Sequence, residues 1–176
     1  MGGAGLMTIV RDSGTFSLLV KALMPPTMPP GAIGRFFAVT QAIIDPGDSL
    51  NYARFGAQLA APGVTGWTAR DVLLQEVVGD TVVPSSASES LARAAGLALA
   101  NPIRPISGLP SGTAPFTGNL ASGATGAIVQ FDTVEGGKLA MHGDLISTPE
   151  AQSQYLELFK SGLAKPHATV MPAYPK

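Results

Sequence analysis

The sequence contains no cysteine, few charged residues and only two histidines. Without cysteine, the chain forms no disulfide, binds no metal through thiolates and has no cysteine nucleophile. Charged residues make up 13% of the 176 residues, and the formal net charge is −1. A chain so close to neutral lacks the basic surface that binds nucleic acid, so we expect no nucleic-acid partner.

Long apolar runs are missing as well. No run approaches the roughly 18 residues of a membrane-spanning helix, and we expect no membrane span. No signal peptide is visible, and the sequence leaves the compartment open between cytoplasm and export. Hydrophobic residues nevertheless form 45% of the chain. With so little polar surface, we expect an apolar groove or a face buried against a second copy, and hence a homo-oligomer.

The first third of the chain is apolar, and most of it is predicted to be helical. Residues 5–10 form a short apolar run that favours a strand, and residues 14–23 predict a helix that ends before a proline-rich stretch. Residues 32–44 predict a helix that is apolar on most faces, either buried or covering an apolar site. Residues 45–60 predict a turn followed by a helix, with Asp48 or Ser49 as its cap.

The rest of the chain alternates strands with helices. The predicted elements are a strand, a helix, a strand and a helix, over residues 71–78, 85–100, 127–132 and 148–164. The last helix is amphipathic, and Leu156, Phe159 and Leu163 are predicted to line its buried face. This alternation predicts an α/β fold with a parallel sheet flanked by helices.

Two residues that can act together in catalysis follow the predicted strands. Asp80 comes directly after the first strand, and His142 lies in a loop soon after the second. Functional groups of parallel sheets lie at the carboxyl ends of the strands. A nucleophilic hydroxyl needs a base, and the base needs a carboxylate to orient it. The sequence therefore predicts His142 as a base and Asp80 as its orienting group.

The same segments resemble a known family. LLQEVVGDTVVPSSASESLARAAGL (73–97) resembles the acidic-residue segment of α/β-hydrolases of the bacterial lipase and esterase type, and AMHGDLIS (140–147) resembles their histidine loop. GAIGRFFAVTQAIIDPGDSLNYA (31–53) resembles the lid-side insert that precedes the acidic segment. The resemblance implies a partial or minimal α/β-hydrolase-like domain, with residues 1–62 as a lid-like helical segment and residues 63–176 carrying the Asp and His loops.

The family's nucleophile motif, Gly-x-Ser-x-Gly, is absent. No serine has glycine at both the −2 and +2 positions, and the chain looks like the rear portion of a hydrolase or a compact relative of one. Ser49 has Gly47 before it and lies on the lid-side segment, which makes it the first candidate for a substitute nucleophile. Ser13 is the second. For both serines, a helix cap is the structural alternative.

The resemblance implies a carboxylic-ester hydrolase that acts on small apolar esters through a serine-type mechanism. It implies no cofactor. Asp132, His142 and Asp144 are close in sequence, but their spacing matches no metal-ligand motif, and we expect no metal. The alternative is a catalytically inactive truncated fragment that acts as an oligomerising or binding module, because lost strands would leave a sheet edge uncovered.

Overall fold

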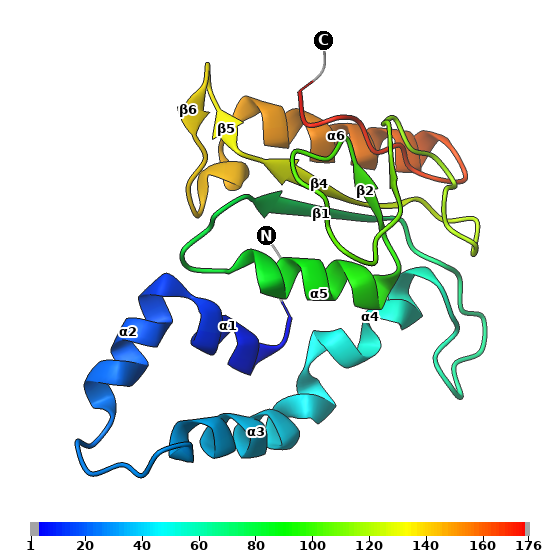
Figure 1. The fold of residues 1–176 in the computed structure, drawn as a ribbon. Helices are drawn as coiled ribbons and strands as arrows, with labels where there is room; N and C mark the ends of the chain where they lie inside the picture. Colours follow the sequence, from blue (N-terminus) through cyan, green and yellow to red (C-terminus); the bar gives the residue numbers. More distant parts are fainter. Residues whose placement is uncertain (1–3, 175–176) are drawn as a thin grey trace.

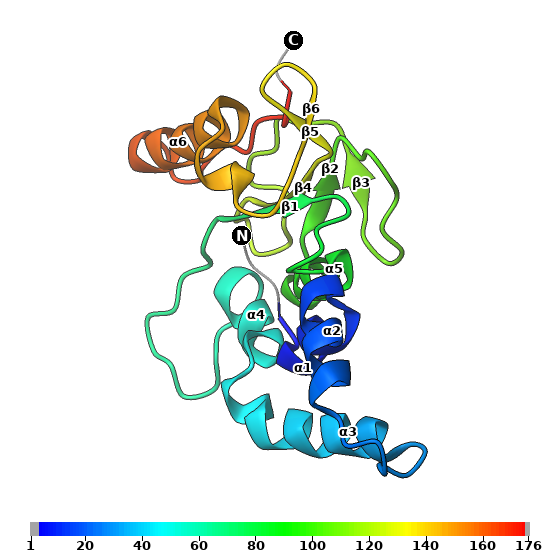
Figure 2. The same ribbon diagram turned by 90° about the vertical axis from the view of Figure 1, so that its left-hand side faces the viewer.

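The computed structural model describes residues 4–174, and its centre is a four-stranded parallel sheet (Figure 1). The strand order is β1-β4-β2-β3, with bounds Val72–Val77, Gly126–Phe131, Ala98–Ala100 and Ser111–Gly112. Helix α6 (Pro149–Ala164) covers one face, and α5 (Ser85–Ala95) covers the other (Figures 1 and 2). The prediction of a mixed α/β fold with a parallel sheet flanked by helices is confirmed.

Strand β4 is the centre of the core. All six of its residues are buried, as expected for a strand of a parallel sheet covered on both faces. Ile128 packs with Leu74 of β1 in the cluster that includes α5, whereas Val129 and Phe131 belong to the cluster that includes Ala151 of α6. Strands β1 and β4 pair along their whole length, so the chain segments that follow them start at the same end of the sheet.

Helix α5 is shorter than the sequence predicts. The prediction extended it to residue 100, but it ends at Ala95, and Gly96 caps it in a left-handed conformation with φ of 67°. Residues 98–100 then form β2, which pairs with β4. Ala and Leu favour helices, and burial of this strand beside β4 overrides that preference.

Helix α6 buries a different face from the one predicted. Leu156, Phe159 and Leu163 are exposed, whereas the buried residues are Ala151, Gln154 and Ser161. Gln154 accepts a hydrogen bond from Gln75 of β1 and donates one to the carbonyl of Met171. Small and hydrogen-bonded residues, with the half-buried Leu158, therefore set the orientation of this helix against the sheet, and Leu156, Phe159 and Leu163 face outward.

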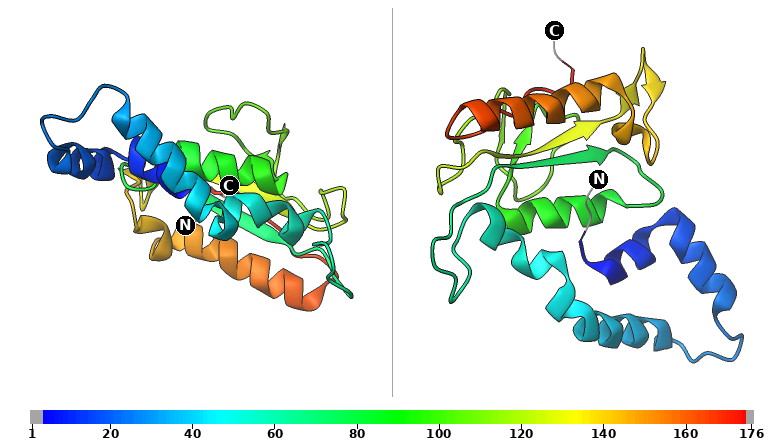
Figure 3. Two further views of the ribbon diagram at one scale, coloured as in Figure 1. Left: turned by 90° about the horizontal axis from the view of Figure 1, so that it is seen from below. Right: turned by 180° about the vertical axis from the view of Figure 1, so that it is seen from behind.

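Four helices precede the sheet: α1 (Leu6–Asp12), α2 (Gly14–Leu23), α3 (Ala32–Ile44) and α4 (Ser49–Ala57). The strand predicted over residues 5–10 is wrong, because this segment lies in α1. Helices α1, α2 and α3 contain no buried residue, and we call them the helical arm. The loop between α2 and α3 lies far from the sheet (Figure 3).

Smaller elements complete the chain. The short 3₁₀ helix η1 (Asp45–Gly47) joins α3 to α4. An antiparallel hairpin of β5 (Thr133–Val134) and β6 (Lys138–Leu139) leads to the 3₁₀ helix η2 (Asp144–Ile146). The boundary proposed between residues 62 and 63 falls in the irregular segment between α4 and β1. Within residues 4–174, none of the helices has the length and apolar character needed to cross a membrane.

Candidate functional site

Asp80 lies in the turn that ends β1. Gly79 adopts φ of 81°, a left-handed conformation that favours glycine, and the chain reverses there. The Asp80 side chain then holds the next residues, since its Oδ1 accepts hydrogen bonds from the amides of Val82 at 2.7 Å and Val83 at 3.1 Å. The strand stops at Gly79-Asp80 because glycine allows the turn and the aspartate stabilises it.

His142 lies in the loop between β6 and η2, and its contact with Asp80 places it at the same end of the sheet. Asp144 fixes this loop by accepting a hydrogen bond from the amide of Met141 at 2.8 Å. His142 Nδ1 lies 2.9 Å from Asp80 Oδ2. The Asp80 side chain is 4% exposed and that of His142 is 36% exposed, so the pair joins a buried carboxylate to an accessible imidazole.

The contact between Asp80 Oδ2 and His142 Nδ1 determines which nitrogen of the imidazole carries the proton. An ionised carboxylate only accepts hydrogen bonds, and Asp80 Oδ1 is already taken by two backbone amides. In the neutral imidazole, Nδ1 therefore carries the hydrogen and donates it to Oδ2, which leaves the lone pair on Nε2. A nitrogen in this state can accept a proton from a hydroxyl, so the structure brings the predicted base and its predicted orienting carboxylate together.

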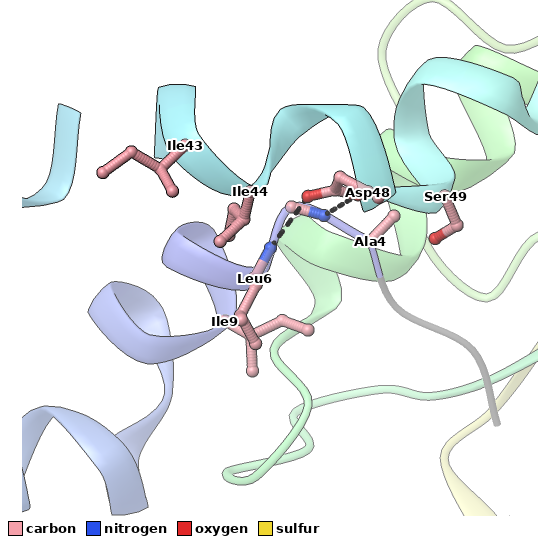
Figure 4. A pocket seen from close by; sticks show the side chains of 9 residues that line it. Ala4, Leu6, Ile9, Ile43, Ile44, Asp48 and Ser49 are labelled. Atoms are coloured by element: carbon pink, nitrogen blue, oxygen red, sulfur yellow. Dashed lines mark hydrogen bonds between the residues drawn. The ribbon is translucent and has the colours of Figure 1, made fainter. Parts of the chain in front are cut away.

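Ser49 lies elsewhere. It is the first residue of α4, and α4 packs against α5, whereas the loop of His142 leads into η2, which packs against α6 on the other face of the sheet. Figure 4 shows Ser49 at the edge of an open pocket of about 530 Å³, beside Asp48. Among the hydrogen bonds of residues 4–174, none joins Ser49 to His142. Its role as nucleophile stays a prediction.

The cap of α4 is Asp48. Its Oδ1 accepts hydrogen bonds from the amides of Leu50 at 2.9 Å and Gly5 at 3.0 Å, and its Oδ2 accepts one from Leu6 at 3.1 Å (Figure 4). One carboxylate thus caps α4 and also fastens the start of α1. Burial acts to raise the pKa of Asp48, but these hydrogen bonds and one from Gln41 outweigh it and lower the pKa.

Ser13 is fully buried and serves as the cap of α2. Its hydroxyl accepts a hydrogen bond from the Phe16 amide at 3.1 Å and donates one to the Thr81 carbonyl at 2.9 Å. This hydroxyl is therefore occupied by structural contacts and ties the helical arm to the residue that follows Asp80.

A partly buried ionic cluster at the same end of the sheet joins Glu76, Glu89 and Arg104, and the sequence does not predict it. Glu76 of β1 is 2% exposed, and Arg104 donates to it at 3.0 Å while also contacting Glu89 of α5. Burial raises the pKa of Glu76, and hydrogen bonds from Ser85 and Arg104 oppose that shift. The cluster holds α5 and the loop after β2 against the C-terminal end of β1. The one indication in the sequence is Glu76, a charged residue within the otherwise mostly apolar strand.

The second histidine of the chain also faces an aspartate. Asp71 precedes β1, and His167 follows α6, so this pair lies at the amino end of the sheet. His167 Nδ1 is 3.5 Å from Asp71 Oδ1. Both carboxylate oxygens of Asp71 accept backbone hydrogen bonds at 2.7 Å, one from Thr125 and one from Ala168. The aspartate is thus a structural link between β1, β4 and the C-terminal segment.

The residues considered for a metal do not form a site. In the part of the chain that the structure describes, no group of three or more His, Asp or Glu side chains is arranged to hold a metal ion. Asp144 holds the loop of His142, and Asp132 accepts a hydrogen bond from the Tyr174 hydroxyl at 3.0 Å. Each carboxylate has a structural role instead.

Comparisons of the chain with protein-family models, with characterised proteins and with solved structures found no match.

Proposed function

We propose that the protein is a carboxylic-ester hydrolase in which His142 is the general base and Asp80 orients it. The observation that carries this proposal is the 2.9 Å contact between Asp80 Oδ2 and His142 Nδ1, formed by residues 62 positions apart in the chain. The carboxylate is buried and anchored by two backbone amides, and the imidazole is accessible. The Asp-then-His order after two neighbouring strands of a parallel sheet, β1 and β4, also supports descent from an α/β-hydrolase.

The chemistry follows from the free nitrogen of His142. A hydroxyl placed at Nε2 gives its proton to the ring while its oxygen attacks the ester carbonyl carbon. The imidazolium that forms is stabilised by the Asp80 carboxylate, and it returns the proton to the departing alcohol oxygen. Water then repeats the sequence on the acyl intermediate and releases the acid. Ser49 is the serine that the sequence offers as the attacking hydroxyl, although among the described residues it lies on α4 and makes no hydrogen bond to His142.

An apolar substrate fits the character of the surrounding chain. The helical arm is tied to Thr81, next to Asp80, through Ser13. Large apolar side chains are exposed along it, and they include Phe16, Leu19, Leu23, Phe36, Val39 and Ile43. Exposed apolar surface of this kind favours apolar ligands over charged ones. We therefore propose small apolar esters as the substrate class.

Hydrolysis of p-nitrophenyl butyrate tests this proposal. The His142→Ala variant is expected to lose about 10²–10⁴-fold in kcat, which is the usual contribution of a general base. The His167→Ala variant is the matched control, since it removes the other histidine and should keep full activity. A wild-type protein without turnover, or equal turnover in the His142→Ala variant, contradicts the proposal.

The nucleophile is identified in the same assay. If Ser49→Ala lowers turnover as much as His142→Ala does, Ser49 is the attacking residue. If Ser49→Ala retains full turnover, the hydroxyl comes from another source and Ser49 is only the first residue of α4.

An oligomerising module is the second candidate. The absence of fully buried residues in α1, α2 and α3 favours it, because helices whose apolar side chains are only partly covered within the chain are stabilised by packing against another surface. This candidate predicts an oligomer by light scattering and no ester turnover. A monomer at high concentration contradicts it.

A further inference from the structure

An apolar hollow lies inside the helical arm, between α1, α2 and α3. It has a volume of about 270 Å³, and Val10, Val20, Met24, Ile33 and Phe37 form most of its wall. This volume is slightly below the roughly 300 Å³ at which pockets for drug-sized ligands begin. An unbranched alkyl chain fits such a hollow better than a bulky ring system does.

The charges around the hollow are unbalanced. Lys21 and Arg11 both border it. Arg11 is neutralised by Asp12, to which it donates at 2.6 Å and 3.0 Å. Lys21 has no carboxylate within salt-bridge distance among the described residues. The hollow therefore has one uncompensated cation at its edge.

The surrounding segment offers no competing anion. Residues 14–44 contain two charged side chains, Lys21 and Arg35, and no aspartate or glutamate. A ligand that suits the hollow thus has an apolar chain and a single negative charge. A dianionic headgroup such as a phosphate monoester suits it less well, because only one cation is free and Asp12 would repel a second negative charge.

We propose that the hollow binds a fatty carboxylate of medium chain length, with its alkyl chain among Val20, Ile33 and Phe37 and its carboxylate beside the Lys21 ammonium. Burial of each methylene strengthens such binding about fourfold while room remains. The exposed ion pair adds about two- to fivefold. The alkyl chain therefore supplies most of the affinity, and Lys21 selects the anionic headgroup.

Isothermal titration with decanoate, below the concentration at which it forms micelles, tests this site. Octanoate, decanoate and dodecanoate measure the dependence on chain length, and decanol and decyltrimethylammonium replace the anion by a neutral and a cationic headgroup. No turnover is measured, so the result does not depend on the hydrolase proposal.

Two pairs of variants locate the binding. Val20→Phe fills the hollow and is expected to weaken decanoate binding about tenfold or more. Leu18→Phe is its control on the exposed face of the same helix, where Leu18 is 66% exposed. Lys21→Gln is expected to weaken binding about two- to fivefold. Arg35→Gln, which removes the other cation of the segment, should leave it unchanged.

One decanoate per chain, a rise in affinity with chain length and weaker binding only in Val20→Phe and Lys21→Gln, with the larger effect in Val20→Phe, support the proposal. Absence of binding, or equal binding by Val20→Phe, overturns it. Decanol that binds as tightly as decanoate overturns the assignment of a carboxylate. Several decanoate molecules per chain would indicate adsorption to the apolar surface. Self-association that Val20→Phe abolishes would show that a second copy of the chain occupies the hollow. Either result overturns the proposal.

Discussion

Two aspartate–histidine pairs occupy opposite ends of the same parallel sheet, and they differ in how each carboxylate uses its oxygens. At the carboxyl end, backbone amides take only Oδ1 of Asp80, so Oδ2 remains for His142 at 2.9 Å. At the amino end, backbone amides take both oxygens of Asp71, and His167 is left with a contact of 3.5 Å to an oxygen already in use.

This difference separates the pair that we propose to be catalytic from a structural pair made of the same residue types. A carboxylate with one free oxygen can orient an imidazole and stabilise its charge. Asp71 holds the backbone through both oxygens, and its 3.5 Å contact with His167 is longer than the 2.9 Å contact between Asp80 and His142. The two carboxylates also differ in burial, since the side chain of Asp80 is 4% exposed and that of Asp71 is 18% exposed.

The largest expected effect concerns activity in Asp80→Asn. The amide oxygen can keep the hydrogen bonds from Val82 and Val83, which directs the NH₂ group toward His142 Nδ1. The ring must then hold its proton on Nε2, where the base is needed. We expect kcat for p-nitrophenyl butyrate to fall on the order of 10²–10⁴-fold, with unfolding free energy changed by less than about 1 kcal/mol. Full activity in the Asp80→Asn variant would contradict the proposal that Asp80 orients His142 as the base.

The matched change at the other end, Asp71→Asn, is expected to affect stability instead. One amide oxygen cannot replace two carboxylate oxygens, so the Thr125 or Ala168 N–H loses its acceptor. We expect a loss of about 1–3 kcal/mol in urea unfolding, with kcat per folded molecule unchanged. If activity falls while stability is retained, the amino-end pair is more than structural.

Asp48, like Asp80 and Asp71, accepts backbone hydrogen bonds, but none of its hydrogen bonds among the described residues is to a histidine. Its pKa is lowered in the folded protein, because hydrogen bonds outweigh burial. A depressed pKa adds stability above the unfolded value of about 3.9, and that stability is lost as the pH falls through the folded pKa. Asp48→Asn replaces Oδ2 by an NH₂ group that cannot accept the hydrogen bond from the Leu6 amide, so it should cost about 1 kcal/mol at neutral pH and progressively less in acid. Urea unfolding across this range measures it, and a constant difference contradicts it.

The sequence predicts the carboxyl-end pair better than the amino-end pair for a physical reason. Gly79-Asp80 ends an apolar strand, and His142 follows the second strand that the sequence predicts, over residues 127–132, so the rule for parallel sheets brings them together. His167 reaches Asp71 only because the C-terminal segment returns past the start of β1, where the Ala168 amide binds Asp71. No local pattern encodes that return.

The errors in the fold have similar causes. Residues 98–100 favour a helix by composition, but the vacant position beside β4 makes them a strand. The amphipathic pattern predicts that Leu156, Phe159 and Leu163 line the buried face of α6, whereas hydrogen bonds of Gln154 determine that face. In the helical arm, the sequence predicts apolar helices correctly from residue 14 onward, but it does not show that their apolar side chains stay exposed within the chain.

The most direct test of the central claim is nitrogen NMR of the two histidine rings in the isotopically labelled protein, at a pH where both are neutral. We predict that His142 carries its proton on Nδ1, held by Asp80, with Nε2 unprotonated, and that Asp80→Asn reverses this state while His167 is unaffected. A His142 ring protonated on Nε2 in the wild-type protein would contradict the account, because the base would then have no free lone pair where a hydroxyl can reach it.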